Sequence, residues 1–187
     1  MSEAVTAEQL AKEGKNAYQR GDYVAAARAF QAASQGFAMA GDSLNAAEMS
    51  NNCSVAFLQA GELEAALNAV EGTVEVFAQA GQISRQGMAL GNRAAALEAL
   101  GRLEEAIEAY QQSADLLEQA GEDKLRANVM QALSALQFRM GRQLQALATM
   151  QSGVEGVRHP SPQQRITRQL LRIPFDMMNK NNPKPGR

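Results

Sequence analysis

Residues that break helices or cross-link a fold are scarce in this chain. All 5 prolines of its 187 residues lie at position 160 or later, so no earlier segment is interrupted by proline. The single cysteine, Cys53, cannot form a disulfide within the chain, which suits a reducing compartment. Tryptophan is absent and aromatic residues make up 5%. The apolar share of 45% is therefore carried mainly by alanine, leucine and methionine, which favour helices.

Long apolar runs and basic leader segments are missing as well. No stretch approaches the roughly 18–20 apolar residues that cross a bilayer. The first ten residues hold neither a basic region nor an apolar one, so they do not resemble a secretory signal. These absences predict a cytoplasmic protein that does not engage a membrane.

Charge is distributed unevenly along the chain. The net charge is −2, but residues 1–138 carry 9 basic and 18 acidic side chains, whereas residues 139–187 carry 9 basic and 2 acidic ones. An acidic body argues against nucleic acid as the partner. The basic end could attract an anionic partner or could be a solvated helix and tail. Because the two parts have complementary charge, self-assembly into homo-oligomers is also open.

Glycines return every twenty residues, and this period predicts the architecture. They stand at Gly21, Gly41, Gly61, Gly81, Gly101, Gly121 and Gly141. Glycine adopts a left-handed backbone without a Cβ clash and commonly closes helices, so each segment between them is predicted to be one helix. Acidic residues follow several of these glycines, where they can cap the next helix: Asp22, Asp42, Glu62 and Glu122.

Residue size repeats with a period of forty, which indicates stacked helical hairpins. Small residues recur at Gly14, Ser54, Ala94 and Ser134, at Ala26, Ala66, Ala106 and Ala146, and at Ala33, Thr73, Ser113 and Gly153. Large apolar residues recur at Phe30, Val70, Tyr110 and Met150, and at Phe37, Phe77, Leu117 and Val157. Small columns let the helices of a hairpin approach closely, and large columns fill the space between hairpins.

The expected organisation is an all-α, right-handed solenoid. After a tail of residues 1–5, helices are predicted near 6–20, 23–40, 43–60, 63–80, 83–100, 103–120, 123–140 and 143–157, paired into hairpins 6–42, 43–82, 83–122 and 123–157. Residues 158–175 contain a helix-start pattern at Ser161, Pro162 and Gln164, which predicts a capping helix near 162–172 with an apolar stripe of Ile166, Leu170 and Ile173. Within the tail of residues 176–187, the stretch 179–187 is polar and contains two prolines, so disorder is expected there.

These columns resemble the tetratricopeptide repeat over residues 6–157. The best match combines Gly14, Gly21-Asp22-Tyr23, Ala26, Phe30 and Ala33; a second is Gly101-Arg102-Leu103-Glu104-Glu105-Ala106 with Tyr110. The forty-residue unit exceeds the usual thirty-four and resembles the long-repeat subclass found in kinesin light chains and bacterial regulators. The resemblance implies a concave groove, lined by the first helix of each hairpin, that takes an extended peptide or a partner's helix. It also implies that Asn52 and Asn92 lie on the groove floor and can bond a peptide backbone.

Other polar residues complete the set of candidate groove residues. Lys12, Lys15, Asn16 and Gln19 share one helix face by their spacing, which could receive an acidic group or could be an exposed N-terminal face. Arg139 is expected to contact charged groups of a ligand at the other end of the groove. Gln59 and Gln131 lie between the two ends.

Signals for catalysis are lacking. The only histidine, His159, lies beside a proline at a predicted helix boundary, and Cys53 falls in a column expected to be buried. No nucleophile elbow, phosphate-binding loop or metal-ligand spacing is found, so no enzyme activity, cofactor or metal site is expected. The sequence predicts a non-enzymatic adaptor that binds a protein or peptide in its groove; the alternative is a homo-oligomeric scaffold.

Overall fold

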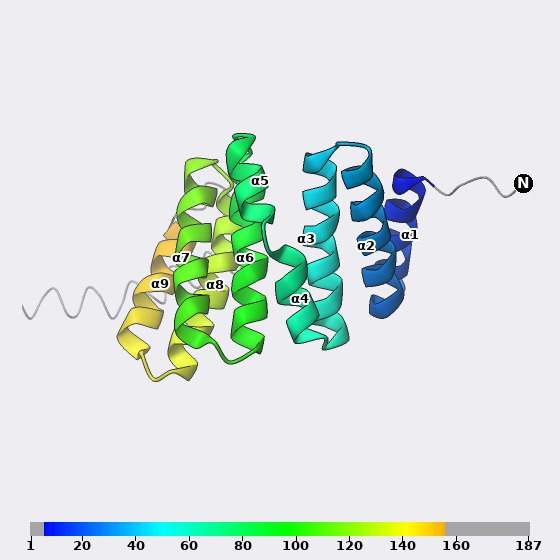
Figure 1. Cartoon of the computed structure of the whole chain (residues 1–187). Coiled ribbons are helices and arrows are strands. Elements are labelled where there is room, and N and C mark those ends of the chain that lie inside the picture. Colours follow the sequence, from blue (N-terminus) through cyan, green and yellow to red (C-terminus); the bar gives the residue numbers. More distant parts are fainter. Residues whose placement is uncertain (1–5, 156–187) are drawn as a thin grey trace, which may run out of the picture.

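Residues 6–155 are described by a computed structural model, with side chains as far as Gly153. All regular structure in this range is α-helical, and the helices follow one another as an antiparallel array (Figure 1). The elements are α1 (Ala7–Gln19), α2 (Tyr23–Met39), α3 (Ser43–Ala60), α4 (Leu63–Val70), α5 (Thr73–Gln79), α6 (Ile83–Ala99), α7 (Leu103–Gln119), α8 (Asp123–Arg139) and α9 (Gln143–Glu155). The predicted all-α repeat solenoid is confirmed.

The turns between helices share one set of backbone hydrogen bonds. At the first, the N–H of Asp22 donates to the carbonyl of Ala17 at 3.0 Å, and the N–H of Gly21 donates to the carbonyl of Tyr18 at 3.0 Å. The five-residue reach of the Asp22 bond recurs after each of the other periodic glycines. All of these glycines have φ between +66° and +81°, so the predicted left-handed turns are confirmed.

Side-chain capping is less regular than the turns. The carboxylates of Asp22 and Asp42 accept hydrogen bonds from the N–H groups of Ala25 and Asn45, at 3.1 and 3.0 Å. Glu62 and Glu122 occupy the same position but make no such bond, so the expectation that they cap is wrong. The residues preferred at this position have short side chains, and glutamate is longer by one methylene.

The size columns form the core. Ala26, Ala66 and Ala106 are fully buried where the two helices of a hairpin cross. Two helices approach closely at Gly14 in α1, where a Cβ atom would lie 2.7 Å from Cδ1 of Phe30 in α2. The absence of a side chain at Gly14 therefore places the Phe30 ring directly against the backbone of α1.

One predicted helix is wrong. Residues 63–80 do not form a single helix, because α4 ends at Val70 and α5 starts at Thr73 at an angle to it (Figure 1). Between them Glu71 is extended at ψ 136° and Gly72 is left-handed at φ +76°. The Thr73 hydroxyl donates to the Val70 carbonyl at 2.8 Å. This bond satisfies a carbonyl at the end of α4 that the helix break leaves free. Glycine followed by β-branched residues has low helix propensity, which favours a break here.

The array ends at α9 in the described range. The predicted capping helix within 158–175 and the tails 1–5 and 176–187 lie outside the described residues. We call α1, α3, α6 and α8 the first helices, and α2, the α4–α5 pair, α7 and α9 the second helices.

Candidate functional site

A groove of about 600 Å³ lies between the first helices α1 and α3. Its apolar lining comes from Ala11, Tyr18, Phe30, Met49 and Val55. Phe30 belongs to α2 and reaches the groove because Gly14 lets its ring pass close under α1. A concave apolar surface of this size is typical of sites that bind a ligand side chain.

Polar side chains surround this apolar lining. Lys12, Lys15 and Gln19 come from one face of α1, and Asn52 comes from the facing side of α3. In the described part of the chain, none of these four side chains has a hydrogen-bond or ion-pair partner. Two ammonium groups, a glutamine amide and an asparagine amide are thus free to contact a ligand. An asparagine amide can both donate to and accept from an extended peptide backbone.

The α1 side of the groove is positive. Glu48 is its one acidic lining residue among the described side chains, and its carboxylate lies 3.2 Å from the guanidinium of Arg85 on α6. Because Arg85 offsets Glu48, the two lysines dominate the local charge. Both lysines are exposed, so attraction to an anionic ligand is expected to weaken as salt rises.

The second predicted groove asparagine is placed differently. Asn92 lies on α6, and its amide donates to the side-chain carbonyl of Asn51 on α3 at 2.9 Å. Asn51 is buried, and the sequence analysis did not single it out. One donor of Asn92 therefore links the second and third hairpins, whereas the amide of Asn52 is free. One sequence signal could have indicated this pair: Asn51 precedes Asn92 by forty-one residues, which places the two asparagines at neighbouring positions on the first helices of successive hairpins.

The remaining candidates do not line this groove. Asn16 and Gln59 are exposed on α1 and α3 and line none of the described clefts. Gln131 and Arg139 line a separate apolar groove at the C-terminal end of the described array. The guanidinium of Arg139 is paired with the carboxylate of Glu98 on α6.

Glu98 also anchors a buried phenol. Tyr110 on α7 donates its hydroxyl to the Glu98 carboxylate at 2.8 Å. Burial raises the pKa of Tyr110 well above its usual range, and the bond to Glu98 adds to this. Glu98 thereby joins α6, α7 and α8, so Arg139 has a structural contact that the sequence did not predict.

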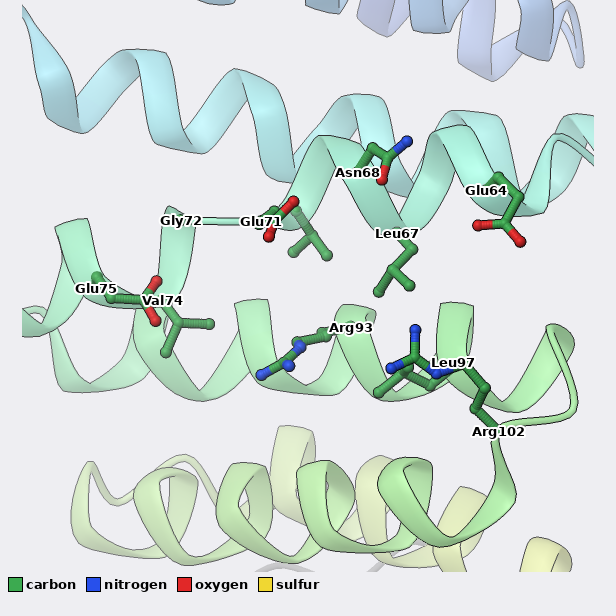
Figure 2. A pocket seen from close by; sticks show the side chains of 11 residues that line it. Glu64, Leu67, Asn68, Glu71, Gly72, Val74, Glu75, Arg93, Leu97 and Arg102 are labelled. Atoms are coloured by element: carbon green, nitrogen blue, oxygen red, sulfur yellow. The ribbon is translucent and has the colours of Figure 1, made fainter.

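The helix break creates a third cleft, of about 360 Å³, between the α4–α5 pair and α6. Figure 2 shows Arg93 of α6 opposite the Glu71–Gly72 junction, with Glu75 on the α5 side. Arg102 at the far end is held by Glu105 through bonds of 2.7 and 2.6 Å. The cleft mixes both signs of charge, and sequence reasoning missed it because it missed the break.

Reactive chemistry is not assembled in the described residues. Cys53 is buried and donates its thiol to the carbonyl of Ala27, and burial raises its pKa to about 11, which keeps it protonated. Within residues 6–153 no group of three or more His, Cys, Asp or Glu side chains could hold a metal ion. None of the described helices is long and apolar enough to cross a membrane.

The comparisons with known proteins agree with this architecture. Residues 85–158 match a family model described as tetratricopeptide repeat. Among curated proteins, none matches the chain. The match covers the third and fourth hairpins, and the same glycine turns and buried columns occur in the first two. Repeats of this family mediate protein–protein interactions. Residues 85–158 of this chain therefore belong to the tetratricopeptide repeat family, and the first two hairpins share the architecture of that part.

Proposed function

We propose that the protein is an adaptor that binds a peptide segment of a partner protein in the groove between α1 and α3. The observation that carries the proposal is the set of free polar groups, on Lys12, Lys15 and Asn52, around an apolar lining. Solubility alone does not require free polar groups to be arranged around an apolar hollow.

The groove suits a particular kind of peptide. Its apolar part, formed around Phe30 and Met49, would take one or two apolar side chains. Asn52 would bond the peptide backbone whatever its sequence, and the two lysines favour an acidic residue or a terminal carboxylate nearby. The expected ligand is therefore a short acidic segment with an apolar anchor.

Selection from a peptide library tests this without knowledge of the partner. The full chain is immobilised, a phage-displayed library of random peptides is selected on it, and enriched peptides are titrated by calorimetry. Asn52→Ala is expected to weaken binding about two- to thirteenfold, since one hydrogen bond is worth about 0.5–1.5 kcal/mol. Lys15→Ala is expected to weaken binding more at low salt than at high salt.

Two exposed positions outside the groove provide matched controls. Lys124→Ala on α8 removes the same charge as Lys15→Ala, and Gln112→Ala on α7 removes an exposed amide. Both are expected to leave the affinity unchanged. Enriched peptides that bind equally well to correctly folded Asn52→Ala and Lys15→Ala variants would reject the groove as the binding site.

A further inference from the structure

The interface between the second and third hairpins differs from its neighbours at one position. Cys53 in α3 and Leu133 in α8 occupy the same forty-residue column, and they are only 2% and 3% exposed. Cys53 contacts α2 through its bond to Ala27, and Leu133 packs into the core beside Ile107 of α7. In α6 this position is held by Arg93, whose side chain is exposed. Because an unpaired guanidinium is costly to bury, Arg93 keeps this interface open.

A helix break opens the same interface from the other side. Extended Glu71 and left-handed Gly72 interrupt the second helix opposite Arg93, whereas α2 and α7 run on without a break. The cleft of about 360 Å³ lies at this level. Figure 2 shows the Arg93 side chain below the Glu71 carboxylate, with Glu75 beyond it on α5. Two departures from the repeat pattern, one on each wall, therefore shape this one cleft.

Three charged groups of the cleft are not used by the protein itself. In the described part of the chain, Arg93, Glu71 and Glu75 have no hydrogen-bond or ion-pair partner. Arg93 attracts the Glu105 carboxylate only through space. Glu105 is already held by two bonds from Arg102, the other cation in the lining. One free guanidinium therefore shares the cleft with two free carboxylates.

Apolar side chains lie between these charges. Val70 and Leu97 are buried, and Leu67 and Val74, which are half-buried, leave apolar surface open to the cleft. Burial of apolar surface is favourable, so a ligand gains affinity from an apolar group placed between Leu67 and Val74.

We propose that this cleft binds a small zwitterion with an apolar side chain: a free amino acid or a dipeptide. The guanidinium of Arg93 can hold a carboxylate through two parallel hydrogen bonds. Glu71 and Glu75 attract the ammonium group, and they repel ligands that carry two or more negative charges, such as phosphates and dicarboxylates. A cleft of about 360 Å³ has the size of a small-molecule site.

Calorimetric titration of the full chain tests both charged ends of the ligand. The probes are leucine and the dipeptide Leu-Leu, each compared with two blocked forms. N-acetylation removes the ammonium group, and amidation removes the carboxylate. Each blocked form is expected to bind at least fivefold more weakly than its parent. Tighter binding of leucine would assign the cleft to a free amino acid, and tighter binding of Leu-Leu would assign it to a dipeptide.

Substitutions link each end of the ligand to its own partner. Arg93→Gln is expected to weaken binding of the parent ligand at least fivefold and to abolish its advantage over the amidated form. Glu71→Gln combined with Glu75→Gln should abolish the advantage over the N-acetylated form instead. Arg28→Gln on α2 is the matched control, because Arg28 is exposed and lines none of the described clefts. It should leave all affinities unchanged.

Several results would overturn the proposal. One is that neither leucine nor Leu-Leu binds at millimolar concentration. Another is that the blocked forms bind as well as their parents, or that folded Arg93→Gln protein binds like the wild type. The amide resonance of Gly72 in ¹⁵N-labelled protein reports the location independently: ligand-induced shifts that spare Gly72 and lie between α1 and α3 would place the ligand in the other groove.

Discussion

Replacement of Gly101 by alanine isolates the energetic contribution of a turn. Gly101 has φ +77°, and an added Cβ would meet nothing within 4 Å, so the substitution introduces no steric contact. What remains is the cost of a left-handed backbone for an L-residue, about 1–2 kcal/mol. Alanine also restricts the unfolded chain, which returns about 0.4–1 kcal/mol. The expected net loss in the free energy of unfolding is therefore about 1 kcal/mol.

Chemical and thermal unfolding measure this loss. For a chain of this size, about 1 kcal/mol lowers the melting temperature by roughly 2–4 °C. Urea unfolding followed by circular dichroism should show a lower midpoint with an unchanged slope. Gly101→Asn serves as the matched variant, because asparagine enters the left-handed region more readily than alanine. It should lose less stability than Gly101→Ala.

Two results would refute this reasoning. If Gly101→Ala unfolds at the wild-type midpoint, the turn does not require a left-handed residue. If Gly101→Asn and Gly101→Ala are equally destabilised, the loss comes from something other than the backbone conformation.

Two further predictions concern the packing of the first hairpins. Gly14→Ala would place a Cβ 2.7 Å from the Phe30 ring, so the ring or α1 must move. The free energy of unfolding, measured in urea, is expected to fall by about 1–3 kcal/mol, and groove-selected peptides should bind more weakly. Wild-type stability would contradict the close approach of α1 and α2. Cys53 should react with Ellman's reagent only on unfolding, because it is buried and a pKa of about 11 leaves roughly one thiolate in a thousand at pH 8. Because this pKa is raised, the reaction rate should increase with pH. Rapid reaction of the native protein at pH 7 would contradict the burial of Cys53.

The regular parts of the fold could be predicted from the sequence because they repeat. A glycine such as Gly61 signals its turn through a local backbone requirement, and a column such as Ala26 signals burial through its period. The turn glycine occurs seven times and the alanine column four times, so each copy supports the others. The helix bounds follow to within one or two residues wherever the period is unbroken.

The break at Gly72 could not be predicted in the same way. It occurs in one hairpin only, so no other repeat supports it, and an isolated glycine is tolerated within helices. The break depends on a combination: the left-handed Gly72, the extended Glu71 and the bond from Thr73 to Val70. The cleft beside Arg93 follows from that break and was missed with it.

The groove illustrates what a helical face can and cannot indicate. Spacing alone placed Lys12, Lys15 and Gln19 on one face, and the structure sets Asn52 opposite them. Whether a polar side chain is free depends on the neighbouring hairpin, which spacing does not describe. Asn92 meets Asn51, and Arg139 meets Glu98, through contacts forty-one residues apart.

The proposed binding site is tested most directly by nuclear magnetic resonance of the full chain with a library-selected peptide. The protein is labelled with ¹⁵N, and backbone and side-chain amide shifts are followed during the titration. We expect the largest changes at Lys12, Lys15 and the side-chain amide of Asn52, with little change along α7. Saturable changes confined to α7, or to the groove between α8 and α9, would contradict the assignment of the binding site to the groove between α1 and α3.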